Sequence, residues 1–208
     1  MTPQAYRAVS TLPSALADIL VGIDCPHPLR AVIDGPICAQ PGELAEALVP
    51  SLQALGRPTA VVHTEWFWRD ASLRLEFGHE DPESFAGSWL DVDALCREVL
   101  APLAVDGAAQ YLPTLRDPST NRVTRARPVA IARRGIVLVA GSLLLGRNLP
   151  FDYTIHLSVT AAARRRRTEP AWQWTLPAFD DYDATVDPVS IADVVVRYDD
   201  PAHPALSE

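Results

Sequence analysis

The chain has 208 residues, 48% of them hydrophobic and 21% charged, which suits one globular domain with a full core. A formal net charge of −8 argues against a general binder of nucleic acids or anionic membranes. The sequence shows neither an apolar run of about 20 residues nor a basic start followed by an apolar core, so we expect no membrane span and no signal peptide.

The first part of the chain alternates between helical and strand patterns. Leu16, Ile19 and Leu20 recur at helical spacing, and Gly56 closes a later helical pattern. The stretch TAVVH is apolar enough for a strand that is buried on both faces. The elements predicted here, in chain order, are a helix at 12–22, a strand at 30–34, a helix at 43–55 and a strand at 59–63.

A long polar and aromatic segment at 65–87 separates these elements from the second part of the chain. Strands that alternate with helices indicate a three-layer α/β/α domain with a mostly parallel central sheet, in which ligands bind beyond the carboxyl ends of the strands. The remaining predictions, in chain order, are a helix at 91–103, a β or loop excursion at 108–130, strands at 135–140 and 153–159, a helix at 161–167 and a strand at 191–197.

The loop after the first strand has the place of a phosphate-binding loop but lacks its chemistry. Such a loop reads G-x-x-x-x-G-K-[ST] before a helix. Here Gly35 is followed by four residues and then by Gln40, Pro41 and Gly42. All 18 basic residues are arginine, so no other register or segment of the chain supplies the lysine.

Cysteine and histidine give no metal motif. Cys25, Cys38 and Cys96 are scattered and form no C-x-x-C pair, and the five histidines are also scattered. We therefore expect a reduced, cytoplasmic protein without a metal site.

Four segments, in their order and spacing, match one family of known proteins. They are RAVIDG before the loop, HTEWFWR after the second strand, GHEDPESFAGSWLDVDAL and VLVAGSLLL, and the tail VDPVSIADVVVRYDDPAHPAL adds to them. Over residues 12–205 the chain resembles the uridine kinase-like branch of the P-loop kinases, next to phosphoribulokinase and pantothenate kinase. This resemblance implies one P-loop kinase-type domain over residues 1–208, with a lid-like segment at about 161–185.

The resemblance places the phosphate loop on a stretch that departs from the family pattern. Gln40 stands at the second glycine, Pro41 at the lysine and Gly42 at the Ser/Thr that holds Mg²⁺. Pro41 also removes an N–H donor, and the carboxylate of Glu43 would repel a phosphate. Ala140 replaces an acidic residue linked to the metal. The phosphate-loop position comprises Gly35, Pro36, Ile37, Cys38, Ala39, Gln40, Pro41, Gly42 and Glu43.

On the acceptor side, the resemblance assigns the catalytic carboxylate, the general base, to Glu65. Two readings stay open for the residues around it. The aromatic cluster at 66–68 fits a stacking wall or core packing, and the polar run at 79–83 fits a pocket edge or a solvated loop that leads into a helix. The predicted acceptor pocket comprises Trp66, Trp68, Phe85, Tyr111 and Arg116, of which the last two also fit turn scaffolding.

The run of arginines at 164–167 provides the phosphate-binding element that remains. The family's lid helix carries arginines three residues apart, and Arg164 and Arg167 match that spacing and share a face. A solvated basic helix is the alternative reading.

Three functional hypotheses follow. The first is a pseudokinase that binds a small nucleoside- or sugar-like ligand, or a partner protein. The second is an active nucleoside or small-molecule kinase, in which Mg-ATP is the cofactor and Arg164 or Arg167 replaces the lysine. The third is a site rebuilt for metal-free chemistry on an uncharged ligand, in an apolar pocket lined by Pro41, Cys38 and Trp66. We expect no nucleic-acid or membrane partner, and a homodimer is compatible with the sequence.

Overall fold

The computed structural model describes residues 6–9 and 11–207, and its core is a seven-stranded sheet. The neighbouring strands β8, β7, β2, β6 and β3 run parallel, and β9 and β1 add an antiparallel edge beyond β8. The prediction of a mostly parallel sheet is confirmed. The strands are β1 (Arg7–Ala8), β2 (Leu29–Asp34), β3 (Thr59–His63), β6 (Ile136–Gly141), β7 (Tyr153–Ser158), β8 (Val194–Arg197) and β9 (Ala205–Ser207).

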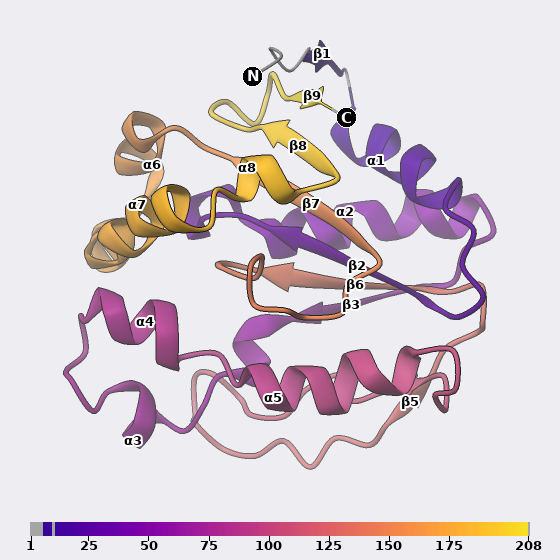
Figure 1. Ribbon diagram of the computed structural model, residues 1–208, viewed down its shortest axis with the longest axis horizontal. Coiled ribbons are helices and arrows are strands. Elements are labelled where there is room, and N and C mark those ends of the chain that lie inside the picture. Colours follow the sequence, from indigo (N-terminus) through magenta and orange to yellow (C-terminus); the bar gives the residue numbers. More distant parts are fainter. Residues whose placement is uncertain (1–5, 10, 208) are drawn as a thin grey trace.

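Helices cover both faces of this sheet and complete the predicted three-layer α/β/α fold. Helices α1 (Leu12–Val21) and α2 (Pro41–Ala54) pack on one face, and α5 (Val92–Leu95) packs on the other. Figure 1 shows α1 and α5 on opposite sides of the strands. The α5 helix continues as a π-helical turn, η3 (Cys96–Leu100), and a 3₁₀ turn, η4 (Ala101–Leu103), so the predicted helix at 91–103 is nearly continuous.

The central strands divide their side chains between two cores. Because successive residues of a strand point to opposite faces, Ala31 and Ile33 pack under α1 and α2, whereas Val32 packs on the side of α5. All of β2 is buried, and so is all of β6. These two strands pair in register so that Asp34 lies beside Gly141 at their carboxyl ends. The cores thereby fix the edge of the sheet at which the loops meet.

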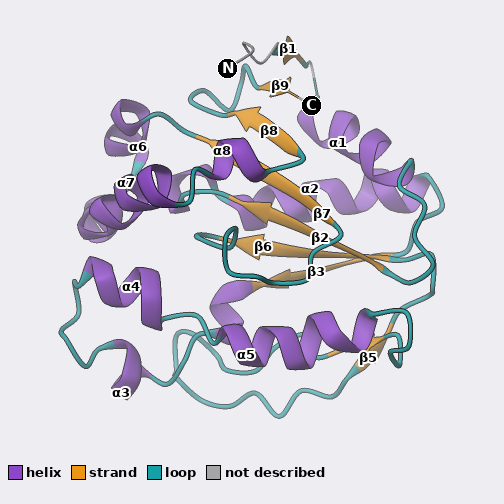
Figure 2. Cartoon of the chain, in the orientation of Figure 1, coloured by secondary structure: helices purple, strands orange, loops and turns teal. Residues whose placement is uncertain are grey.

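Short helical segments gather at this carboxyl edge. In Figure 2 the arrowheads of β2 and β6 point toward the side where α4, α6 and α7 lie. Within the described part of the chain, no helix is long and apolar enough to span a bilayer. The segments are η1 (Ile37–Ala39), η2 (Thr64–Phe67), α3 (Ala71–Arg74), α4 (Pro82–Ser88), α6 (Ala161–Arg167), η5 (Pro170–Thr175), α7 (Leu176–Thr185) and α8 (Pro188–Ile191). The excursion at 108–130 holds a two-stranded ribbon of β4 (Gln110–Tyr111) and β5 (Val129–Ala130).

Three local predictions differ from the structure. Helix α2 begins at Pro41 instead of residue 43, because proline suits the first turn of a helix, where its missing N–H leaves no bond unmade. The last strand begins at Val194 instead of residue 191, because 188–191 form α8. The segment at 65–87 contains α3 and α4, each begun by an aspartate whose side chain accepts a hydrogen bond from the backbone of the first turn.

Candidate functional site

A cavity of about 430 Å³ lies at the carboxyl ends of β2, β3 and β6. It joins the phosphate-loop position to the predicted acceptor side. From the predicted site it includes Ile37, Gln40, Pro41, Gly42, Glu43, Glu65, Trp68 and Phe85. It also includes residues that the sequence did not indicate, among them His63, Trp89, Ser142, Arg147 and Trp172.

Two backbone N–H groups of the phosphate-loop position donate to carbonyls within the same loop. Ala39 N donates to Pro36 O at 2.8 Å and Gln40 N donates to Ile37 O at 3.0 Å, which makes the 3₁₀ turn η1. Gly35 N donates to Gly141 O at 3.1 Å. A phosphate cradle needs such N–H groups to point at the ligand. Because prolines at 36 and 41 lack an N–H group, the donors that the loop keeps for an anion are the N–H groups of residues 37, 38, 42 and 43.

Gln40 stands where the phosphate-loop pattern has its second glycine, and its backbone has a conformation that is typical of glycine. Gln40 has φ 52° and ψ 56°, in the left-handed region that glycine adopts without strain. Its side-chain Nε2 donates to Glu43 Oε1 at 2.6 Å. The loop therefore holds a carboxylate at the helix start, where the family binds a phosphate.

The His63 ring fills the space that a side chain at position 42 would need. A Cβ atom built on Gly42 would lie 2.6 Å from His63 Nδ1, closer than real Cβ atoms approach a neighbour. His63 Nε2 lies 3.0 Å from Glu46 Oε1, and its Nδ1 lies 4.0 Å from Glu65 Oε1. A side chain at position 42 would therefore require the His63 ring to move, and this imidazole stands at the end of the cavity nearest the helix.

The two lid arginines are engaged with the protein itself. Arg164 is buried and its Nη2 pairs with Asp180 and Asp183 at 2.6 and 2.9 Å. Arg167 Nη2 donates to Cys38 O at 2.8 Å, and its Nη1 bonds the carbonyl of Tyr198. Neither arginine lines the 430 Å³ cavity. Arg167 instead ties the phosphate-loop position to the segment after β8.

An aromatic wall forms the acceptor side of the cavity. Trp68 and Trp89 meet edge to face with ring centroids 5.0 Å apart, and Trp172 from η5 lies 6.4 and 6.2 Å from them. Two hydrogen bonds hold this wall: Arg69 N donates to Trp89 O and Asp91 N donates to Phe67 O. Phe85 contacts Trp89 at 5.3 Å. Segments far apart in the sequence thus converge on one apolar surface.

Three residues of the predicted acceptor pocket do not line the cavity. Trp66 packs against the core below it, and its carbonyl accepts from the backbone of 115 and 116. Tyr111 is buried in the same core, where burial raises the pKa of its hydroxyl. Arg116 pairs with Asp70 at 3.0 Å and donates to Asn121 O. For these three side chains the structure shows packing and turn bonding.

A buried polar network below the loop was not predicted. Asp34 Oδ1 accepts from Leu144 N at 2.8 Å, and its Oδ2 lies 2.8 Å from His156 Nδ1 and 3.1 Å from the Tyr182 hydroxyl, which donates to it. Burial raises the pKa of Tyr182, and the neighbouring Asp34 carboxylate raises it further. These residues come from β2, β7 and α7, so only the fold brings them together.

Arg147 is the cation that borders the cavity, and it too escaped prediction. Its Nε donates to Leu143 O and its Nη2 to the carbonyl of Ala86 on α4. Burial lowers the pKa of this guanidinium, and the nearby Tyr182 and Asp34 oppose that shift. The residue links the end of β6 to the aromatic wall.

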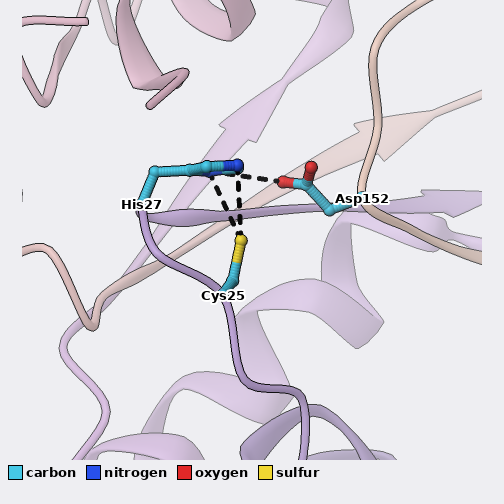
Figure 3. Close-up of side chains that lie close together, drawn as sticks. All are labelled: Cys25, His27 and Asp152. Carbon is cyan, nitrogen blue, oxygen red and sulfur yellow. Dashed lines mark hydrogen bonds and ion pairs between the residues drawn. The ribbon is translucent and has the colours of Figure 1, made fainter. Parts of the chain in front are cut away.

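A second cluster lies at the opposite end of the strands. Figure 3 shows Cys25 beside the His27 ring, with Asp152 facing it. The Cys25 sulfur is 3.5 and 3.4 Å from the two ring nitrogens, so it lies over the ring and not along a nitrogen lone pair. Arg30 holds Asp152 through two side-chain bonds of 3.0 and 2.6 Å. The cluster is an ion pair that braces the amino end of β2.

Comparison with protein-family models finds no match, and no curated protein matches the sequence. Forty-two solved chains match the fold. A Bacillus stearothermophilus protein described as a possible uridine kinase has a TM-score of 0.71 at 21% identity, over 88% of this chain and 96% of its own. A Silicibacter protein described as a candidate fructose transport system kinase has a TM-score of 0.60 at 22% identity, over 86% and 89%. D-glycerate 3-kinase from Cryptococcus neoformans has 0.54 at 14%, over 86% and 82%. The chain therefore has the fold of uridine kinase-like P-loop kinases.

Proposed function

We propose that this chain is a uridine kinase-like pseudokinase, which binds a small nucleoside- or sugar-like ligand in the aromatic cavity and does not transfer phosphate from ATP. One observation carries the proposal: the His63 ring fills the space beside Gly42 that the Mg²⁺-binding hydroxyl side chain would need. The closed turn at 37–39 and the prolines on both sides of it support the same conclusion.

The missing interactions with the transferred phosphoryl group are worth enough free energy to abolish the reaction and not merely to slow it. A single preorganised donor to a developing charge contributes about 3 to 4 kcal/mol, and here the lysine, the N–H group at its position and the hydroxyl are missing together. The Glu43 carboxylate lines the same cavity at the start of α2 and would repel a triphosphate. Arg164 and Arg167 compensate neither loss, because neither lines the cavity and the Nη2 groups of both already bind aspartates or a carbonyl of the protein.

The acceptor side supports ligand binding. Small-molecule sites are concave and mostly apolar with a few polar groups, and this cavity has aromatic rings on one side and Glu65 on the other. The Glu65 side chain is 42% exposed, so its carboxylate is free to reach a hydroxyl group of a ligand.

Calorimetry with Mg-ATP tests the proposal, and we expect no heat of binding at millimolar ATP. A phosphorylation assay with a panel of nucleosides and sugars should give no product. Mg-ATP-dependent product that disappears in Glu65→Gln would refute the pseudokinase and establish the alternative, an active kinase with an unusual donor site. The intact carboxylate at Glu65 is the observation that keeps this alternative in the test.

A further inference from the structure

The charges around the aromatic cavity are the reverse of those in a phosphate site. Glu43 and Glu65 are the carboxylates that line it, and Arg147 is the guanidinium. Two of the donor groups of Arg147 are already bonded to carbonyls of the protein, which fixes the direction of its guanidinium. The His63 ring stands between Glu46 and Glu65. With two carboxylates and one guanidinium, the formal charge of the cavity lining is negative.

The aromatic wall also suits a positive charge. Indole and phenyl rings carry electron density on their faces and attract cations within about 6 Å of the ring centroid. The wall already stacks one cation: the Arg74 guanidinium carbon lies 5.1 Å from the Trp68 ring and 4.8 Å from the Trp89 ring. Arg74 does not line the cavity, and its Nε donates to the carbonyl of Arg69 at 2.9 Å. The Trp172 and Phe85 rings complete the wall, and no cation of the described residues stacks on either of them.

We propose that the ligand of this cavity is an organic cation, a protonated amine or a quaternary ammonium group on a small ring or polyol body. This inference rests on the proposed function. The proposed function leaves the chemical class of the ligand open, and the inference names that class. The cation would lie against the Trp68 and Trp172 rings, with Glu65 and Glu43 as its counter-charges. An anionic ligand would meet these carboxylates with no lysine to balance them.

A matched pair of probes isolates the charge. Choline and 3,3-dimethyl-1-butanol have the same shape, and only choline carries the positive charge. Because the chain has five tryptophans, the indole N–H signals of a ¹⁵N-labelled sample report on the wall during each titration. We expect the neutral alcohol to bind about tenfold more weakly than choline.

Charge-neutral variants test the assignment of the counter-charges. Glu65→Gln and Glu43→Gln should each weaken choline binding about threefold and leave the alcohol unchanged. Both side chains are partly exposed, so the fold should persist in both variants. Glu76→Gln is the control, because Glu76 is exposed and does not line the cavity.

The outcomes separate this inference from the proposed function. Equal affinity for the alcohol and choline, an unchanged preference in both glutamine variants, or no signal change with choline at tens of millimolar would each overturn the cation assignment. None of these results would restore ATP chemistry. Conversely, phosphorylation of a nucleoside from Mg-ATP would overturn the proposed function, while the charge preference would still be decided by the titrations.

Discussion

Replacement of Gly42 with alanine tests whether the His63 ring has taken the place of a side chain at the helix start. The new Cβ would lie 2.6 Å from His63 Nδ1 and 2.9 Å from its Cε1. Overpacking of this kind costs about 1–3 kcal/mol, whereas alanine gains about 0.5–1 kcal/mol over glycine within a helix. We therefore expect Gly42→Ala to lower the free energy of unfolding by about 1 kcal/mol.

Removal of the ring should reverse the sign of this effect. In a His63→Ala background the new Cβ would have no other atom closer than 4 Å outside its own helix turn, so Gly42→Ala should raise stability by about 0.5–1 kcal/mol. Urea unfolding followed by tryptophan fluorescence measures all four members of the cycle, and a change of 1 kcal/mol moves the midpoint by about 0.3–1 M. The coupling free energy between positions 42 and 63, calculated from these four stabilities, measures the contact between the new Cβ and the ring.

A helix glycine with open space provides the control. A Cβ on Gly87 in α4 would meet nothing within 4 Å, so Gly87→Ala should be mildly stabilising in both backgrounds. If Gly42→Ala stabilised the parent protein as Gly87→Ala does, the ring would not fill that space. The principal support for the pseudokinase proposal would then be lost.

Three further outcomes are expected. Tyr182→Phe removes the donor to Asp34 and the acceptor for Leu145 N, both buried, and should lower the free energy of unfolding by about 1–3 kcal/mol in urea. Because the folded pKa of Tyr182 is raised, its contribution is complete below about pH 10 and declines as the pH rises above that value. Between pH 8 and 11 the midpoint temperature of thermal unfolding should therefore fall less steeply in Tyr182→Phe than in the parent protein. An equal fall in both proteins would contradict this. Arg167→Ala frees the carbonyl of Cys38, and hydrogen exchange at the amides of 39 and 40 should become faster, whereas exchange within β2 should not.

The sheet could be predicted from the sequence because its strands are buried on both faces. The six residues of β2 and the six of β6 are all buried, so their apolar runs identify them without any neighbour. The loop between β2 and α2 was predictable for a similar local reason, since a loop between a strand and a helix is visible in the sequence. Its departures from the phosphate-loop pattern, at Gln40, Pro41 and Gly42, are likewise read from the sequence alone.

The remaining features depend on contacts between distant segments. Asp34, His156 and Tyr182 are separated by more than 100 positions from one end of the network to the other, and no local pattern marks a buried polar group. Arg147 has an ordinary sequence context, and only its position between β6 and α4 gives it a role. Helix α7 escaped because its sequence, LPAFDDYDAT, begins with a proline-containing turn and has only a weak apolar stripe.

The departures from the phosphate-loop pattern are coupled, and this bears on how the site could be restored. Gln40→Gly, Pro41→Lys and Gly42→Ser together rebuild the motif, but the serine Cβ would still meet the His63 ring. We therefore expect the triple variant to be less stable than the parent and to show no Mg-ATP binding by calorimetry while His63 is present. A site that had merely lost its motif residues would have kept room for them, and the triple variant would then bind Mg-ATP. That result would contradict the view that the surrounding residues have adapted to a site without ATP.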